Sequence, residues 1–175
     1  PRLHLLKEVT VNGKPAASLL DSKTFSDAYL SGLTMTGDTM YVVANPAYYG
    51  YYDSPVASTG QTTATSWETS SSRLMIFDLS QNKFNAIYDQ PTKANNLDVM
   101  GANQGRLFLS LSGDGIVAVD VSNPAQPKGV KFLRTLGWAN SLEAVGDDLY
   151  VASGYFGLDH MNLSAADTLP VDSAP

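Results

Sequence analysis

The chain has 175 residues, enough for one domain, and 43% of them are hydrophobic, so it can bury a core. Only 16% are charged, the net charge is −6, and the eleven basic residues never form a run, which argues against a nucleic-acid-binding surface. The absence of cysteine excludes disulfides, thiolate metal sites and thiol catalysis. No apolar run reaches the roughly 18 residues that a membrane-spanning helix needs.

A repeat of 42 residues runs through most of the sequence. Residues 3–11 with the turn pair Asn12-Gly13 predict a strand and a turn, and we expect residues 1–32 to be part of a preceding unit. Residues 73–80, 115–122 and 157–164 then align at steps of 42, and each follows a second repeated strand at 40–44, 107–111 or 149–153. The predicted units are therefore 33–96, 97–141 and a partial unit at 142–175, and the first carries an insertion at 45–72.

The middle unit predicts four short strands. They span 97–100, 106–112, 116–122 and 130–136, separated by a turn at 101–105, a tight turn at 113–115 and a loop with two prolines at 123–127. Segments 74–79 and 116–121 are apolar at odd and even positions alike, as in strands covered on both faces. The sequence predicts an all-β chain with four-stranded propeller blades, and we expect it to be a portion of a larger propeller. A β-sandwich is the alternative.

The segment 115–127 resembles a known repeat family. Its apolar stretch, its Asp, the following Ser-Asn-Pro and a second Pro resemble the LVIVD repeat, which continues here in 137–140, 146–152 and 154–158. The resemblance covers 97–164 well and 33–80 less well, and 159–162 departs from it with a polar Asp-His pair that suggests an exposed or edge strand. The resemblance implies a β-propeller of bacterial or archaeal envelope or secreted proteins, and it brings no catalytic residues.

The insertion is the most individual part of the sequence. It contains four tyrosines close together and one tryptophan, has no Lys or Arg, and continues through a stretch where Ser and Thr predominate. Tyrosine and tryptophan give rigid contact area that suits protein or sugar recognition. We expect an interaction loop; the alternatives are a structural cover and a flexible Ser/Thr-rich stalk of the kind that carries glycans. The predicted binding residues are Tyr48, Tyr49, Tyr51, Tyr52 and Trp67.

Other polar residues favour structural roles. Asp78, Asp120 and Asn162 recur at one repeat position, where they either cap turns or form a ring of cation ligands, and we expect the caps. Asp114, Asp147 and Asp148 are read as turn residues, because the ordered ligands of a calcium loop are missing. His4 and His160 are the only histidines, and no further ligand set or Gly-x-Ser-x-Gly elbow accompanies them, so neither a zinc site nor a catalytic triad is supported. No metal, cofactor or catalytic residue is predicted.

Three aromatic residues outside the insertion have open roles. Trp138 is expected to pack between units, whereas Tyr155 and Phe156 either cap the core or extend a binding face. The resulting hypothesis is a non-enzymatic binding or scaffold module, secreted or at the cell envelope, that recognises a protein or glycan. The alternatives are a structural subunit of a larger surface assembly or filament, and a fragment of a propeller enzyme whose catalytic residues lie outside this chain.

Overall fold

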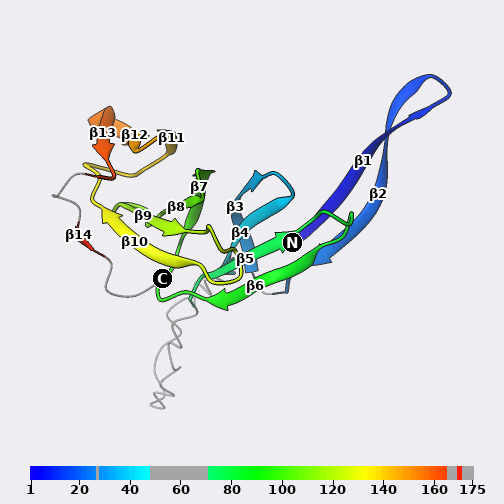
Figure 1. Ribbon diagram of the computed structural model, residues 1–175, viewed down its shortest axis with the longest axis horizontal. Helices are drawn as coiled ribbons and strands as arrows, with labels where there is room; N and C mark the ends of the chain where they lie inside the picture. The colour runs from blue at the N-terminus through cyan, green and yellow to red at the C-terminus, as the bar shows by residue number, and fades with distance from the viewer. Residues whose placement is uncertain (27, 48–70, 165–168, 171–175) are drawn as a thin grey trace, which may run out of the picture.

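The computed structural model describes residues 1–26, 28–47, 71–164 and 169–170, and Figure 1 gives their arrangement. Their regular structure consists of antiparallel strands and a single 3-10 turn, η1 (Gly154–Phe156), so the all-β prediction is confirmed for this part of the chain. The strands are β1 (Arg2–Val11), β2 (Lys14–Thr24), β3 (Ala28–Thr36), β4 (Thr39–Pro46), β5 (Arg73–Asp78), β6 (Asn85–Pro91), β7 (Asp98–Asn103), β8 (Arg106–Ser110), β9 (Ile116–Asp120), β10 (Lys128–Leu133), β11 (Ser141–Val145), β12 (Asp148–Ala152), β13 (Leu158–Asn162) and β14 (Leu169–Pro170).

These strands form a hairpin and three larger sheets. The hairpin consists of β1 and β2, and it projects from the rest of the molecule in Figure 1. The first sheet has the order β3-β4-β5-β6, the second β7-β8-β9-β10 with β14 added beside β10, and the third β11-β12-β13. Each sheet is thus an antiparallel meander of consecutive strands, apart from the short β14, which returns from the end of the chain to the second sheet.

The three sheets pack face to face in chain order. One apolar cluster joins the first and second sheets through residues such as Val43, Ile76 and Leu109, and another joins the second and third through residues such as Phe108 and Leu149. Their first strands also lie together, with β3 against β7 and β7 against β11. Because both faces of the second sheet are buried, its strand β9 is apolar at every position from 116 to 119, as the sequence pattern indicated.

One backbone hydrogen bond repeats in all three sheets. The N–H groups of Leu79, Val121 and Leu163 donate to the carbonyls of Asp38, Gly105 and Asp147, at 2.8, 2.7 and 2.8 Å. Each bond joins the residue after the third strand to the turn between the first two strands. The bonded residues are 16 apart in the second and third sheets and 41 apart in the first. The first sheet thus holds 25 additional residues between these positions, as the predicted insertion requires.

The base of the hairpin covers part of the outer face of the first sheet. Leu3 and Leu5 of β1 pack on a cluster that contains Met75 and Phe77. The Asp21 carboxylate accepts a hydrogen bond from the Phe84 N–H at 2.8 Å, which ties β2 to the turn between β5 and β6. That backbone hydrogen bond is the main reason why the pKa of Asp21 is lowered.

Several predicted boundaries were wrong by a few residues. The turn expected at 101–105 is shorter, because β7 continues through Asn103 with an irregular register near Met100. The turn is made by Gln104 and Gly105, both with positive φ, as the tightest hairpin turns require. The strand expected at 130–136 instead runs from Lys128 to Leu133. The last predicted unit also contributes a strand to the preceding one, since β14 pairs with β10 of the second sheet.

The edge position of β13 agrees with its polar sequence. Within the described residues, β13 pairs only with β12, and its His160 ring stacks on Tyr150 with centroids 4.9 Å apart. No helix in the part of the chain that the structure describes is long and apolar enough to cross a membrane.

Candidate functional site

The predicted binding residues of the insertion, Tyr48, Tyr49, Tyr51, Tyr52 and Trp67, lie outside the described residues, but both ends of the insertion are described. Asn45 at the end of β4 is 1% exposed and Ser72 before β5 is fully buried. The Ser72 hydroxyl donates to Asn45 Oδ1, so the two ends are bonded to each other directly. The insertion therefore starts and finishes at one point of the first sheet.

A polar network holds this point against the next connection of the chain. Asn45 Nδ2 donates to the Leu97 carbonyl at 2.8 Å, and the Leu97 N–H donates to Asn45 Oδ1 at 3.1 Å. Ser31 of β3 donates to the same carbonyl at 2.5 Å. The Thr92 N–H and hydroxyl both donate to the Ser72 carbonyl, at 2.7 and 2.9 Å. Buried polar groups that are paired in this way fix their geometry, so the root of the insertion is firmly placed.

The insertion emerges at the same end of the sheets as four other connections. It joins the second and third strands of its sheet, as residues 111–115 and 153–157 do in the other two sheets. Neighbouring connections are in contact. The Ser112 hydroxyl donates to the Asn96 carbonyl at 3.2 Å, Gly113 lies beside the Trp138 indole, and Gly137 lies against the Phe156 ring. We call the segments 92–97, 111–115, 134–140 and 153–157 the loop surface.

The loop surface exposes large aromatic and aliphatic side chains. Trp138 is 66% exposed, so the expectation that it packs between the units was wrong. Tyr155 is fully exposed and Phe156 is 65% exposed, which favours the binding-face alternative over a cap on the core. Leu136, in the same connection as Trp138, is also largely exposed. Such a concentration of apolar side chains on a surface typically marks an interaction site.

Asp159 positions two of these connections relative to each other. Its Oδ2 accepts hydrogen bonds from the Leu136 N–H at 3.1 Å and from the Ser153 hydroxyl at 2.6 Å. Those donors belong to different connections, so one carboxylate joins segment 134–140 to segment 153–157. Sequence reasoning missed this role, because Asp159 was read only as a sign of a polar strand. Its departure from the apolar repeat was the available signal.

Close packing also explains a glycine of the loop surface. A Cβ atom on Gly137 would lie 2.7 Å from both the Phe156 ring and the Ser153 carbonyl. A larger residue at this position would displace the Phe156 side chain or the backbone of the 153–157 connection. Trp138 and Phe156 thus each lie against a neighbouring connection, whereas the Tyr155 side chain is fully exposed.

The recurring Asp or Asn after the third strand of each sheet caps a turn. Oδ1 of Asp78, Asp120 and Asn162 accepts the N–H of the residue two positions later, at 2.9 Å in all three cases. This backbone hydrogen bond is also the main cause that lowers the pKa of Asp78 and of Asp120. The capping interpretation is therefore confirmed. Among the described residues, no cluster of three or more His, Cys, Asp or Glu could hold a metal ion.

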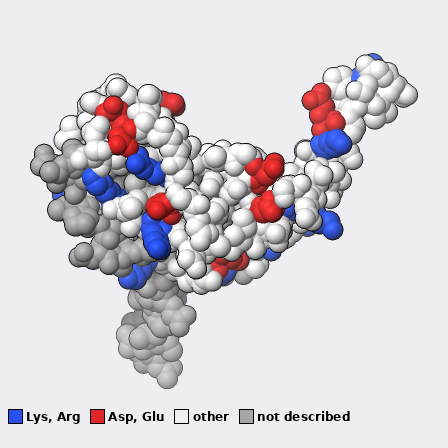
Figure 2. Space-filling view, in the orientation of Figure 1, with Lys and Arg blue, Asp and Glu red and all other residues white. Residues whose placement is uncertain are grey.

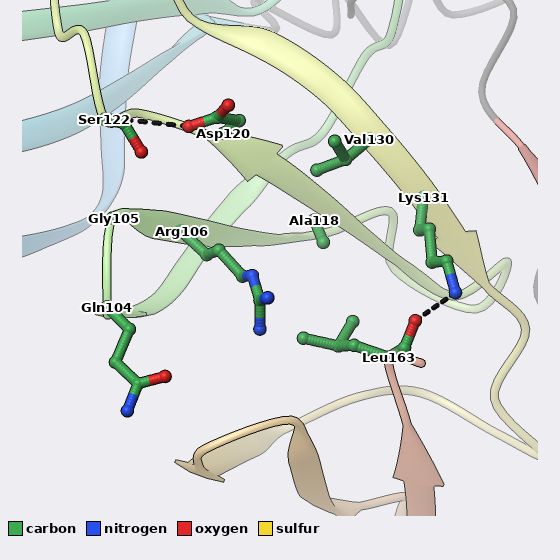
Figure 3. Close-up of a pocket in the computed structure, with 9 residues that line it drawn as sticks. All are labelled: Gln104, Gly105, Arg106, Ala118, Asp120, Ser122, Val130, Lys131 and Leu163. Atoms are coloured by element: carbon green, nitrogen blue, oxygen red, sulfur yellow. Dashed lines mark hydrogen bonds between the residues drawn. The ribbon is translucent and has the colours of Figure 1, made fainter. Parts of the chain in front are cut away.

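A cavity of about 390 Å³ lies between the second and third sheets, at the end away from the loop surface (Figure 3). Arg106 and Lys131 point into it from β8 and β10, and Leu163 closes it from the third sheet. Arg106 forms an ion pair with Asp147, and Lys131 donates to the Leu163 carbonyl. Hydrogen bonds from Ser164 and then Arg106 lower the pKa of Asp147. These contacts connect the third sheet to the second. We therefore interpret the cavity as part of the interface between the two sheets rather than as a binding site.

Comparison with protein-family models and with curated proteins finds no match to this chain. The resemblance of residues 97–164 to the LVIVD repeat therefore stays a prediction.

Proposed function

We propose that this chain is a non-enzymatic binding module of a β-propeller of the LVIVD type, secreted or located at the cell envelope, and that it recognises a glycan or protein through the loop surface. The propeller assignment is supported by three successive antiparallel sheets that pack face to face with their first strands together. These are features that propeller blades share. An image of the assembled protein would test this part of the proposal, since a propeller has a ring of blades around a channel.

One observation carries the binding assignment. Trp138, Tyr155 and Phe156 are exposed on connections that are fixed by packing, and this surface continues to the root of the Tyr-rich insertion. Rigid aromatic side chains contribute contact area at a small entropic cost, which suits recognition of sugar rings or of a protein surface. Binding at connections carried on a rigid β scaffold is a common arrangement.

The test is a titration of the protein with a panel of soluble oligosaccharides, monitored by tryptophan fluorescence and by calorimetry. We expect a sugar that binds the wild type to lose at least tenfold in affinity with Trp138→Ala/Tyr155→Ala. Removing residues 48–67 should weaken binding as well. Met35→Ala removes an exposed apolar side chain of the first sheet at the end opposite the loop surface, so it is the matched control and should bind normally.

If no sugar binds, a biotinylated form of the protein can be used to capture protein partners, with the same three variants as probes. Capture that is equally efficient with the wild type and with Trp138→Ala/Tyr155→Ala would refute the assignment of binding to the loop surface.

A further inference from the structure

The outer face of the third sheet carries a mixed apolar and acidic surface. Alternation along the strands places nine residues on this face, and the cross-strand partners arrange them in three rows: Ser141, Ala152 and Leu158; Glu143, Tyr150 and His160; Val145, Asp148 and Asn162. Leu158 is 68% exposed, Val145 is 61% exposed, and Tyr150 is also exposed. Both faces of the second sheet are covered, whereas the outer face of the first sheet is covered only in part and leaves Leu33 and Met35 about half exposed.

The charge of this sheet is uniformly negative. Residues 141–162 contain four Asp or Glu and no Lys or Arg, and acidic side chains are prominent over this region in Figure 2. Two of the four, Glu143 and Asp148, belong to the outer face. Hydrogen bonds from Asn162 and His160 lower the pKa of Asp148, so this carboxylate is ionised at neutral pH.

The hairpin at the other end of the molecule has the complementary character. Residues 1–24 contain four Lys or Arg and two Asp or Glu, although the whole chain has a net charge of −6. Alternation along β1 and its pairing with β2 place one set of residues on the face that begins with Leu3 and Leu5. Beyond Leu5 we call this set the basic face: Lys7, Val9, Val11, Lys14, Ala16 and Ser18.

The outer part of the hairpin does not pack against the three larger sheets. Its base rests on the first sheet through Leu3 and Leu5, but Val11 at the outer end of the basic face is more than half exposed. Leu6 and Leu19, which pair with each other on the opposite face, are also more than half exposed. A two-stranded hairpin with no covering layer is only marginally stable in water, and its edges are open for pairing. The hairpin and the third sheet lie at opposite ends of the molecule in Figure 1, so a contact between them has to join two copies.

We propose that the hairpin of one copy docks through its basic face on the outer face of the third sheet of a second copy. Lys7 and Lys14 then meet Glu143 and Asp148, and Val9 and Val11 cover Val145, Tyr150 and Leu158. The hairpin would cover the third sheet of its neighbour as its base covers part of the first sheet of its own chain. The two faces are different, so the contact is head-to-tail and repeats from copy to copy as an open chain or a ring.

The size of the contact predicts a weak association. Three strands of five residues make a face of roughly 16 Å by 14 Å, from a rise of about 3.3 Å per residue and a spacing of about 4.8 Å. An interface on this face is smaller than the roughly 1,200–2,000 Å² of a standard stable complex. We expect a dissociation constant on the order of 10 μM or weaker, and a clear dependence on salt because opposite charges meet at the protein surface.

The experiment is sedimentation velocity of the wild type over a range of concentrations, at low and high salt. We expect an average mass that grows with concentration without stopping at a dimer and that falls when salt is added. Lys7→Glu/Lys14→Glu should remain monomeric, and so should Ser141→Lys/Glu143→Lys, which reverses the charge of the other face. The control Lys93→Glu/Lys128→Glu makes the same change in net charge as Lys7→Glu/Lys14→Glu, away from both faces, and should associate like the wild type.

A mixture of the two reversed variants gives the sharpest outcome. Each presents to the other a pair of faces with opposite charge, so the mixture should associate although neither variant does so alone. Circular dichroism checks that both are folded, and hydrogen exchange should reveal protection of β1, β2 and β11–β13 in the wild type that increases with concentration. A wild type that stays monomeric, a closed dimer unaffected by the variants, or folded variants that fail to associate when mixed would each overturn the proposal.

Discussion

Replacing Asn45 by alanine tests whether the root of the insertion is held as the structure indicates. The change removes the hydrogen bonds of Asn45 with both backbone groups of Leu97 and its bond with the Ser72 hydroxyl. The site is buried, so water does not replace these partners. A buried group left without a partner costs about 1–3 kcal/mol. Ser31 still donates to the Leu97 carbonyl, and the Leu97 N–H still reaches the Ser72 hydroxyl at 3.4 Å, so we expect a total loss of about 3 kcal/mol at most in the free energy of unfolding.

Urea denaturation followed by circular dichroism measures this loss. For a chain of this length, about 3 kcal/mol corresponds to a decrease in Tm of roughly 6–12 °C. Asn95→Ala is the matched control, because Asn95 is an exposed asparagine of the adjacent connection. Ser72→Ala should cost less than Asn45→Ala, and the double variant should cost less than the sum of the two, since both remove the same bond.

Two results would contradict this reasoning. A loss below about 0.5 kcal/mol, which is usual for surface substitutions, would mean that the network does not stabilise the fold. Strict additivity of Asn45→Ala and Ser72→Ala would mean that the two side chains do not act together, and the insertion would then lack the fixed root on which the loop surface depends.

Three further predictions concern the framework. Gly115→Ala should cost more than about 2 kcal/mol in urea denaturation, because its Cβ would lie 2.3 Å from the Leu133 carbonyl at a φ of +141°, whereas Gly101→Ala has open space and should cost far less. Leu109→Ala in the fully buried cluster should cost about 2–5 kcal/mol, and Leu136→Ala on the loop surface almost nothing; equal losses would refute the packing described. Acid should destabilise the protein: carboxylates with a lowered pKa contribute stability above their unfolded pKa of about 3.9, and that stability is lost as the pH falls through their lower folded values. Thermal melts from pH 6 to pH 2 measure this, and a constant Tm below about pH 4 would contradict the roles of Asp21, Asp78, Asp120, Asp147 and Asp148.

The buried strands and the turn caps could be predicted from the local sequence pattern. The spacing of 42 residues placed the buried strands β5, β8 and β9 within a few residues of their observed bounds, because their apolar runs can only be accommodated between covered faces. The turn caps at Asp78, Asp120 and Asn162 were predictable for a similar reason, since a carboxylate or amide that bonds the N–H two residues later is a local interaction. Less regular strands were placed less well. The bulged β7 ran past its expected end, because register depends on the neighbouring strand.

The candidate site was only partly predictable. The Tyr-rich composition of the insertion indicated a binding role, but composition does not tell which other segments lie beside it. Trp138 was misplaced because a tryptophan next to a glycine in a connection reads equally well as packed or exposed. Asp159 was overlooked because its hydrogen bonds reach Leu136, 23 residues earlier in the chain.

The sequence by itself determined the all-β class, the repeat, the turn caps and the place of the insertion, because each of these depends on contacts between residues near in the chain or on strict alternation along a strand. Only the tertiary structure decided which connections form one surface, which sheet β14 joins, and which sheet faces remain open. Those features depend on how whole sheets pack, through contacts such as that of Gly137 with Phe156, whose partners are distant in sequence and leave no periodic signal.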